Sequence, residues 1–231
     1  MDFERHRYQE IFHDNVKVRC RILIVCEGEK TEPNYFKAFD QMQHGSMVYK
    51  VECEGGKINT MQVVEKAIEL RNKAIASGNP YDTVWAVFDK DDFPASSFNE
   101  AIKKAEQEQI GCAWSNEAFE LWYVFHFVNR ITAMKRKEYQ HTISTQVNKS
   151  QHYTQKTKYV YQKNDPQTHA IMTTYGDEDR AILFAQKQAD SFKDTRYATH
   201  NPCTMVYKLV RLLLGKDEEF NRKIKEDLNK S

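Results

Sequence analysis

The chain has 231 residues, of which 34 are lysine or arginine and 33 are aspartate or glutamate, so its formal net charge is close to zero. This length suits one large domain, or a core domain with an elaborate insertion or appendage. The charge balance excludes a uniformly basic nucleic-acid-binding protein, so any such surface must come from local segregation of charge. The five cysteines form no C-x-x-C pair, and so indicate neither a zinc knuckle nor a disulfide framework.

No targeting or membrane-spanning segment stands out in the sequence. Residues 1–13 are charged and mixed, without the apolar stretch of a signal peptide. No segment reaches the roughly 18 apolar residues that a membrane span needs. We therefore expect a cytoplasmic protein without a membrane partner, and the oligomeric state stays open.

Apolar runs and helical periodicity alternate through the first half of the chain. Strands are expected near residues 20–26, 47–53, 82–88 and 111–115. Helices are expected around residues 35–39, 60–77 and 98–108. Parallel strands buried on both faces are typically continuous apolar runs, so this alternation predicts an α/β fold with a Rossmann-like parallel sheet flanked by helices.

Two acidic clusters follow the first and third expected strands. They read E-G-E at residues 27–29 and D-K-D-D at residues 89–92. Open α/β sheets present their ligands at the carboxyl ends of strands, so these carboxylates should lie side by side as hard oxygen ligands for Mg²⁺ or Mn²⁺. Asp89 and Asp91 are the best candidate ligands, because alternate side chains of a strand share a face. Asp92 then points elsewhere or lies on the loop.

A basic segment occupies residues 130–163. It contains eight lysines or arginines and one acidic residue, a local balance of +7. Its tyrosines are Tyr139, Tyr153, Tyr159 and Tyr161. Bases can stack on aromatic rings while cations hold phosphates, so this mixture suits a single strand or an RNA loop, although a solvated surface is the plain alternative. The candidate nucleic-acid contacts are Lys135, Arg136, Lys137, Lys149, Lys156, Lys158 and Lys163.

The remaining sequence predicts three parts for the chain. Residues 20–127 would form the α/β core that carries the metal site. Residues 128–215 would form a basic, largely helical elaboration that packs on the core, with helices near 178–192 and 202–214. Residues 216–231 would form a charged helix or tail.

Four motifs carry a resemblance to a known family. They are ILIVCEGEKTE at 22–32, VFDKDD at 87–92, SNEAFELW at 115–122 with HF at 126–127, and NPCT at 201–204. In this order they closely resemble the RloB-like proteins, which belong to the wider Toprim group. The resemblance covers about residues 20–214. It implies a compact Toprim-like fold, a divalent metal ion and phosphodiester chemistry.

The resemblance also implies roles for single residues. Toprim proteins share a glutamate after the first strand and an Asp-x-Asp after the third, which map onto Glu27, Asp89 and Asp91. RloB-like proteins are associated with restriction loci and phage defence, often as partners of an ATPase, and related Toprim effectors cleave nucleic acid, including tRNA. We therefore expect a nuclease effector that acts on RNA or DNA with Mg²⁺ or Mn²⁺ held by Glu27, Asp89, Asp91 and Asp92. Glu27 either binds a second metal ion, serves as general base, or orients the attacking water.

Five further residues could support these ligands: Gly28, Glu32, Asn116, Glu120 and His126. Gly28 permits a tight turn between strand and helix. Glu32 suits the first turn of a helix, where the macrodipole favours acids, and it is also close enough to support the site. Glu120 falls in an aromatic segment where it must find a partner, whether the metal, a lysine or a backbone cap. Asn116 either caps the next helix or serves the site, and His126 fits a core position better than a catalytic one.

Two other functions stay open. Phosphatase-like or primase-like phosphoryl chemistry fits less well, because an aspartyl phosphatase usually carries Asp-x-Asp-x-Thr or Val early in the chain, and Phe93 occupies the last position here. The second alternative is a catalytically quiet subunit that binds nucleic acid or acts as a sensor for a defence ATPase. The intact acidic set argues against a loss of metal binding in such a subunit.

Overall fold

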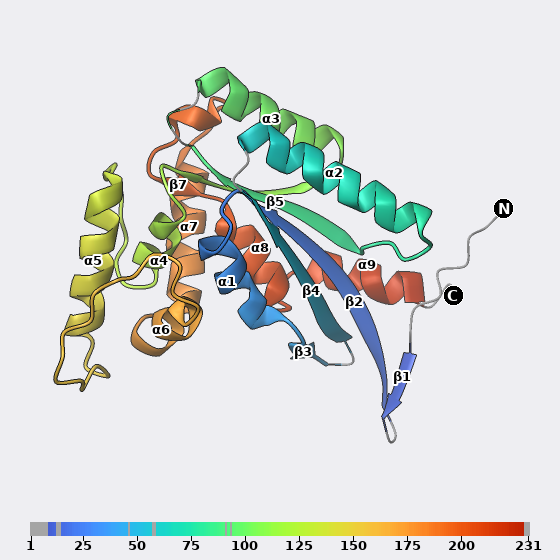
Figure 1. Ribbon diagram of the computed structural model, residues 1–231, viewed down its shortest axis with the longest axis horizontal. Helices are drawn as coiled ribbons and strands as arrows, with labels where there is room; N and C mark the ends of the chain where they lie inside the picture. Colours follow the sequence, from blue (N-terminus) through green and yellow to red (C-terminus); the bar gives the residue numbers. More distant parts are fainter. Residues whose placement is uncertain are drawn as a thin grey trace.

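Parallel strands form the middle of the sheet (Figure 1). The computed structural model describes residues 9–12, 15–45, 47–56, 59–90, 92 and 94–228. The described strands form one seven-stranded sheet, made of β1 (Gln9–Phe12), β2 (Asn15–Cys26), β3 (Gln43–His44), β4 (Met47–Gly55), β5 (Thr83–Asp89), β6 (Gly111–Asn116) and β7 (Cys203–Thr204). The strand order is β3-β4-β2-β5-β6-β7, and β1 pairs with β2.

The sheet is mixed, which corrects the prediction of a parallel sheet. β4, β2, β5 and β6 are parallel and correspond to the four predicted strands. The strands β1, β3 and β7 pair antiparallel with β2, β4 and β6. Because β3 and β7 have only two residues each, they leave no periodic pattern to detect. The segment 202–214 was predicted as one helix, but its first residues form β7 and the helix α8 begins only at Val206.

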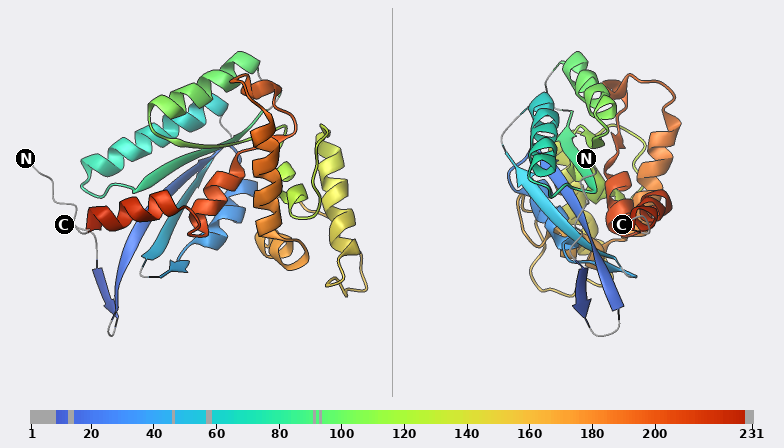
Figure 2. Two further views of the ribbon diagram at one scale, coloured as in Figure 1. Left: turned by 180° about the vertical axis from the view of Figure 1, so that it is seen from behind. Right: turned by 90° about the vertical axis from the view of Figure 1, so that its right-hand side faces the viewer.

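Helices cover both faces of the sheet (Figures 1 and 2). Their bounds are α1 (Thr31–Phe36), α2 (Thr60–Ala76), α3 (Ala95–Gln107), α4 (Glu120–Phe125), α5 (Arg136–Lys149), α6 (Thr168–Tyr175), α7 (Glu178–Ser191), α8 (Val206–Leu213) and α9 (Glu218–Leu228). Two short 3-10 turns, η1 (Lys37–Phe39) and η2 (Tyr197–Thr199), complete the described elements. The sequence predicted no separate helix at α5 or α6. In the described part of the chain, no helix combines the length and apolar character that a membrane crossing requires.

The side chains of β2 explain its continuous apolar run. Leu23 and Val25 pack with residues of α2 and α3 on one face of the sheet. Ile22 and Ile24 belong to the larger core on the other face, with residues of α1, α4, α5, α7 and α8. All four are at most 1% exposed. A strand covered on both faces needs an apolar residue at every position, and this continuous apolar run is what allowed β2 to be predicted from the sequence.

Helix α2 shows how local sequence sets the limits of an element. The Asn59 side chain accepts a hydrogen bond from the backbone N–H of Gln62, and the Gln62 side chain accepts one from the backbone N–H of Asn59. This reciprocal pair satisfies N–H groups that the first turn of a helix leaves free. Beyond the last turn, Gly78 takes a φ of 71°, which a residue without a Cβ adopts at little cost.

The chain beyond residue 127 packs on the same core as α1 and α4. Helices α5, α7 and α8 contribute Tyr139, Ala181 and Leu209 to this core. Figure 1 shows α5 at the edge of the molecule, on the side toward which β2 and β5 point. This packing sets part of the basic segment beside the carboxyl ends of the parallel strands. The proposed division of the chain into three parts stays a prediction.

Candidate carboxylate site

The carboxyl ends of β2 and β5 lie side by side. Cys26, the last residue of β2, pairs with Val87 of β5. Glu27 extends this ladder by donating its backbone N–H to the Val87 carbonyl, at 2.9 Å. Glu27 Oε2 then accepts a hydrogen bond from the backbone N–H of Asp89, at 3.0 Å. The register of two neighbouring strands therefore joins two acidic residues that are distant in the chain.

A pocket of about 420 Å³ opens at these strand ends. Its lining residues are Gly28, Glu29, Lys30, Thr31, Glu32, Asp89, Phe119, Glu120, Lys163 and Asn164. We call it the carboxylate pocket, because Asp89 from β5, Glu32 from α1 and Glu120 from α4 all line it. Glu27 adjoins this group through its hydrogen bond to Asp89. Three separate elements thus bring acids to one place.

Glu32 is more than a first-turn acid. It lies in the first turn of α1, as predicted, but it is only 6% exposed. Its carboxylate packs directly on Gly28, where an added Cβ would lie 2.2 Å from Glu32 Oε2. Oε2 is buried without a hydrogen-bond partner. Gly28 is therefore required by the close approach of this carboxylate, a reason that the sequence pattern did not reveal.

Glu120 has a partner that the sequence did not predict. As the first residue of α4 it is 7% exposed. Tyr161 donates its hydroxyl to Glu120 Oε1 at 3.3 Å. Burial, followed by the charge of Glu120, raises the pKa of Tyr161, so the phenol keeps its proton and remains the donor. A tyrosine of the basic segment thus holds the Glu120 carboxylate at the pocket wall.

The crowded acids raise one another's pKa values. Burial raises the pKa of Asp89 well above its ordinary value, and the charges of Glu32, Glu120 and Glu27 raise it further. Burial also raises the pKa of Glu27, against the opposing effect of the hydrogen bond from Asp89. The pKa of Glu32 rises because of burial, although backbone N–H groups near its carboxylate partly oppose this. Carboxylates held this close favour either protonation or a cation among them.

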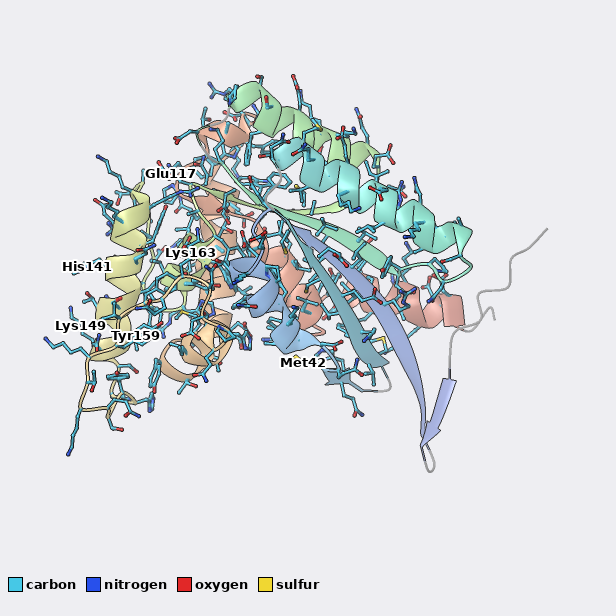
Figure 3. The ribbon with its side chains drawn as sticks, in the orientation of Figure 1. Met42, Glu117, His141, Lys149, Tyr159 and Lys163 are labelled. Carbon is cyan, nitrogen blue, oxygen red and sulfur yellow. The ribbon has the colours of Figure 1, made fainter. Side chains whose placement is uncertain are left out.

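Two cations of the basic segment border the acids. Lys163 lines the carboxylate pocket, and its charge offsets part of the rise in the pKa of Glu32. The charge of Arg136, the first residue of α5, offsets part of the rise in the pKa of Glu27 and of Asp89. Figure 3 shows Lys163 beside α1, whereas Lys149, the last residue of α5, lies away from α1.

Two hydrogen bonds to α1 position the loop that carries Lys163. Thr31 Oγ1 donates to Asn164 Oδ1 at 2.8 Å, and Asn34 Nδ2 donates to the Asn164 carbonyl at 3.0 Å. Asn164 also takes a φ of 73°, which asparagine tolerates better than most residues. No sequence motif indicated this contact between residues 130 positions apart.

A second pocket, of about 870 Å³, lies around the ends of β5 and β6. Its lining residues are Lys90, Asp92, Asn116, Glu117, Arg136, Ala198 and Asn201. We call it the outer pocket. Asp92 lines this outer pocket and does not line the carboxylate pocket, so its predicted role as a metal ligand beside Asp89 stays a prediction that this placement does not support. Asn116 Nδ2 donates to the Ala198 carbonyl at 3.0 Å and does not cap α4, whose N-cap is Phe119.

One predicted site residue, His126, does not join the acids, and another, Asp91, is not described. His126 is fully buried, its Nδ1 lies 3.0 Å from the Trp122 carbonyl oxygen, and burial lowers its pKa to about 4. The charged or titratable neighbours that act on His126 are Glu178, His169 and Asp177, none of which lines the carboxylate pocket. His126 is therefore a core residue. Asp91 lies outside the described residues, so its expected place beside Asp89 stays a prediction.

The tyrosines of the basic segment are largely inside the protein. Tyr139 is fully buried and Tyr161 is 6% exposed, and both belong to the core. The ring of Tyr153 contacts that of Tyr175, with centroids 5.3 Å apart. The prediction that nucleic-acid bases stack on these rings is therefore wrong for Tyr139 and Tyr161. The exposed cations of the segment, Lys135, Arg136, Lys137, Lys149, Lys156, Lys158 and Lys163, stay predicted nucleic-acid contacts.

The donor chemistry of the carboxylate pocket suits a hard divalent cation. Within the described ranges, no group of three or more His, Cys, Asp or Glu side chains is already placed to hold a metal ion. The acidic side chains of the pocket nevertheless offer carboxylate oxygens as ligand atoms, and one of them, Glu32 Oε2, is buried without a hydrogen-bond partner. These are the ligands that Mg²⁺ and Mn²⁺ prefer. A cation would therefore need the carboxylates to draw closer together than they stand here.

Comparison with known proteins gives one match. The family model described as RloB-like protein matches residues 22–213, which is most of the chain. Neither the curated proteins nor the solved structures gave a match. The matched range contains every acidic residue of the carboxylate pocket.

Proposed function

Because the chain belongs to the RloB-like family, we propose that it is a metal-dependent effector that cleaves phosphodiester bonds in RNA or DNA. The observation that carries the proposal is the meeting of Glu27, Asp89, Glu32 and Glu120 at two strand ends. Partly buried acids that raise one another's pKa destabilise the fold when they are charged. A bound cation best explains why the fold tolerates this loss of stability, and Mg²⁺ or Mn²⁺ suits the oxygen ligands of the site.

The chain's own residues suggest how the roles divide. Asp89, Glu32 and Glu120 would hold the cation, together with Asp91 as the fourth candidate. A bound Mg²⁺ or Mn²⁺ polarises the phosphate and lowers the pKa of an attacking water. Glu27 has a raised pKa and an orientation set by the Asp89 N–H, so it is suited to accept a proton from that water.

The cations at the border of the site suit a phosphate substrate. Lys163 lines the carboxylate pocket and Arg136 lines the outer pocket, so they approach the acids from two sides. A phosphate near Asp89 would be repelled by the carboxylates, and these two charges offset that repulsion. Lys163 and Arg136 are thus the members of the basic segment that we expect to position the substrate.

Family membership supports a role in a prokaryotic phage-defence system. The order of the parallel strands, with Glu27 directly after β2 and Asp89 as the last residue of β5, also supports the Toprim-like arrangement that the family implies. We include both in the proposal, together with an ATPase as the expected partner and tRNA among the candidate substrates. An alternative is a catalytically quiet subunit that binds nucleic acid.

The proposal is tested by incubating the purified protein with total RNA and with supercoiled plasmid in parallel, with Mg²⁺, with Mn²⁺ or with EDTA. We expect cleavage that depends on the cation and that is lost in Glu27→Gln. Glu54→Gln is the matched control, because Glu54 is an exposed glutamate at the end of the neighbouring strand β4 and does not line the pocket. This control should cleave like the wild type.

Two outcomes would count against the proposal. Equal cleavage by the wild type and Glu27→Gln would show that the activity comes from another site or a contaminant. Binding of RNA or DNA without cleavage, both with and without the partner ATPase, would instead support the catalytically quiet subunit that binds nucleic acid.

A further inference from the structure

A buried chain of hydrogen bonds joins α1, α4 and α7 beside the carboxylate pocket. The Trp122 indole N–H donates to the Tyr35 hydroxyl at 2.7 Å, and that hydroxyl donates to Glu178 Oε1 at 2.8 Å. Tyr35 and Trp122 are fully buried, and the side chain of Glu178 is 14% exposed. We call these three residues the Tyr35 link. None of the three lines the carboxylate pocket itself.

Each group of the Tyr35 link has the partner that its chemistry requires. An indole nitrogen can only donate, and a charged carboxylate can only accept. Burial raises the pKa of Tyr35 well above its ordinary value, so the phenol keeps the proton that it donates. Burial also acts to raise the pKa of Glu178, but the contacts with His169 and Tyr35 outweigh it and leave this pKa below its ordinary value. The link therefore ends on a charged acceptor, which makes the stronger kind of hydrogen bond.

The Tyr35 link ties together the two helices that carry Glu32 and Glu120. Tyr35 lies one helical turn after Glu32 in α1, and so on the same side of that helix. Trp122 follows Glu120 within the first turn of α4. The ring of Tyr35 also contacts that of Phe119, which lines the carboxylate pocket, with centroids 5.8 Å apart. The hydrogen bond from Trp122 to Tyr35 therefore limits how far α1 and α4 can separate.

The two acids on these helices repel each other. Burial raises the pKa of Glu32, and the charge of Glu120 raises it further. This repulsion favours a wider separation of α1 and α4 whenever both carboxylates are charged. Tyr161 restrains Glu120 through its hydroxyl, at 3.3 Å from Oε1. The Tyr35 link restrains the helices themselves, from within the core.

We propose that Tyr35 is a positioning residue that sets the separation of Glu32 and Glu120, and so makes the carboxylate pocket prefer a small divalent cation to a larger one. Mg²⁺ binds oxygen ligands at about 2.0–2.1 Å in nearly octahedral geometry, whereas Ca²⁺ accepts about 2.3–2.6 Å and a more flexible arrangement. Two helices that are tied through the core can hold their carboxylates at the shorter spacing. This role of Tyr35 rests on the proposed function, because it requires a cation in the pocket.

The variant Tyr35→Phe removes the hydroxyl and keeps the ring in the core. The metal-free, full-length protein is titrated by calorimetry with Mg²⁺ and, separately, with Ca²⁺. In Tyr35→Phe the affinity for Mg²⁺ should fall by at least about tenfold, the usual loss when a group that orients a metal ligand is removed. The affinity for Ca²⁺ should fall less, so that the preference for Mg²⁺ drops by at least about threefold. A purely structural role would lower the melting temperature without changing this preference.

Tyr123→Phe is the matched control. Tyr123 is fully buried in α4, and its ring centroid lies 5.6 Å from that of Tyr35. Its hydroxyl has no hydrogen-bond partner among the residues that the structure describes. The control therefore removes a hydroxyl from the same core without breaking a hydrogen bond, and it should bind both ions like the wild type.

Two variants at the outer end of the link extend the test, in case Tyr35→Phe does not fold. Glu178→Ala removes the acceptor of the Tyr35 hydroxyl at a partly exposed position, and should weaken Mg²⁺ binding more than Ca²⁺ binding. Glu178→Gln keeps an amide oxygen as acceptor, so it should weaken Mg²⁺ binding less than Glu178→Ala does. Equal losses of Mg²⁺ affinity in these two variants would show that the hydrogen bond to Tyr35 is not what matters.

Two further results would overturn the role of Tyr35 and leave the cation site standing. The first is wild-type affinity for both ions in Tyr35→Phe. The second is an equal loss for Mg²⁺ and Ca²⁺, which would show that the hydroxyl supports the fold without selecting the ion. The absence of Mg²⁺ and Ca²⁺ binding in the wild type would instead overturn the proposed function, and the role of Tyr35 with it.

Discussion

The acids of the carboxylate pocket and the cations of the basic segment are held in opposite ways. Strand register fixes Glu27 against Asp89, and contact with Gly28 and Tyr161 fixes Glu32 and Glu120. The basic segment instead exposes most of its cations on α5 and on the loop that follows. Lys163, which lines the carboxylate pocket, and Arg136, whose charge acts on Glu27 and Asp89, are the cations that the structure places beside the acids. Position relative to the sheet, rather than the number of charges, therefore decides which cations we expect to serve the site.

Removing one acid of the pocket should give the largest effect. Asp89→Asn keeps the size of the side chain but removes the charge that we expect to hold the cation. Cleavage with Mg²⁺ should fall by at least about a hundredfold, the loss typical of removing a main electrostatic group from an active site. The measurement is the initial rate of cleavage of the substrate found in the parallel assay.

The neighbouring aspartate on the loop provides the contrast. Asp92 lines the outer pocket and is exposed, so Asp92→Asn should change the rate only a few-fold. A loss in Asp92→Asn as large as that in Asp89→Asn would move the site to the outer pocket.

Adding a single methyl group at Gly28 should disturb the acids from the backbone side. In Gly28→Ala the new Cβ would lie 2.2 Å from Glu32 Oε2, so the Glu32 carboxylate must move. We expect cleavage to fall by about 10–100-fold, the size of effect that a displaced supporting group has at a metal site.

A double-mutant cycle separates this mechanism from general damage to the loop. If Gly28→Ala acts by moving Glu32, its effect should largely vanish in a Glu32→Ala background, where the space is free. Full additivity of the two substitutions would show that Gly28 acts in another way.

The raised pKa values predict an effect of pH on the metal-free protein. Asp89, Glu27 and Glu32 have higher pKa values in the fold than in the unfolded chain, so the fold favours their neutral forms. Their contribution to stability is complete below the ordinary carboxyl pKa and is lost as the pH rises through the raised values. At pH 7.5, Asp89→Asn should therefore be more stable than the wild type by on the order of 1 kcal/mol, a few degrees in melting temperature.

Thermal melts at pH 5 and pH 7.5 in EDTA measure this difference. The stability advantage of Asp89→Asn should be smaller at pH 5 and should shrink at pH 7.5 when Mg²⁺ is added to both proteins. An advantage that does not depend on pH would show that the Asp89 carboxylate is not destabilised in the fold.

The smallest effect concerns the exposed cations. Charge reversal at Lys156 and Lys158 should weaken nucleic-acid binding modestly and make it less dependent on salt. The slope of log K against the logarithm of the salt concentration should fall in magnitude by about 0.7 for each lost contact to a single strand. Lys163→Gln should in addition lower the cleavage rate, because Lys163 lines the carboxylate pocket. Binding titrations at several salt concentrations measure the affinity and its salt dependence, and the cleavage assay measures the effect of Lys163→Gln. Unchanged binding in the charge-reversal variant would show that these exposed cations are only a solvated surface.

The sequence predicted the part of the fold that depends on local pattern. The four parallel strands and helix α2 were found because burial on two faces or on one stripe leaves a periodic signal. The convergence of Glu27 and Asp89 followed from strand order alone. The strands β3 and β7 were missed because two residues carry no period.

The parts of the site that depend on long-range packing could not be predicted in this way. The partner of Glu120 is Tyr161, which the sequence offered as a base-stacking residue. The place of Lys163 depends on contacts between Asn164 and α1. Such contacts between distant segments arise from tertiary packing, for which spacing along the chain gives no signal.

Direct measurement of cation binding tests the central claim, that the carboxylate pocket holds a divalent ion. Calorimetric titration of the metal-free protein with Mn²⁺ should show saturable binding in the wild type and in Glu54→Gln, and should show none in Asp89→Asn. Equal binding of Mn²⁺ by Asp89→Asn and the wild type would contradict the account.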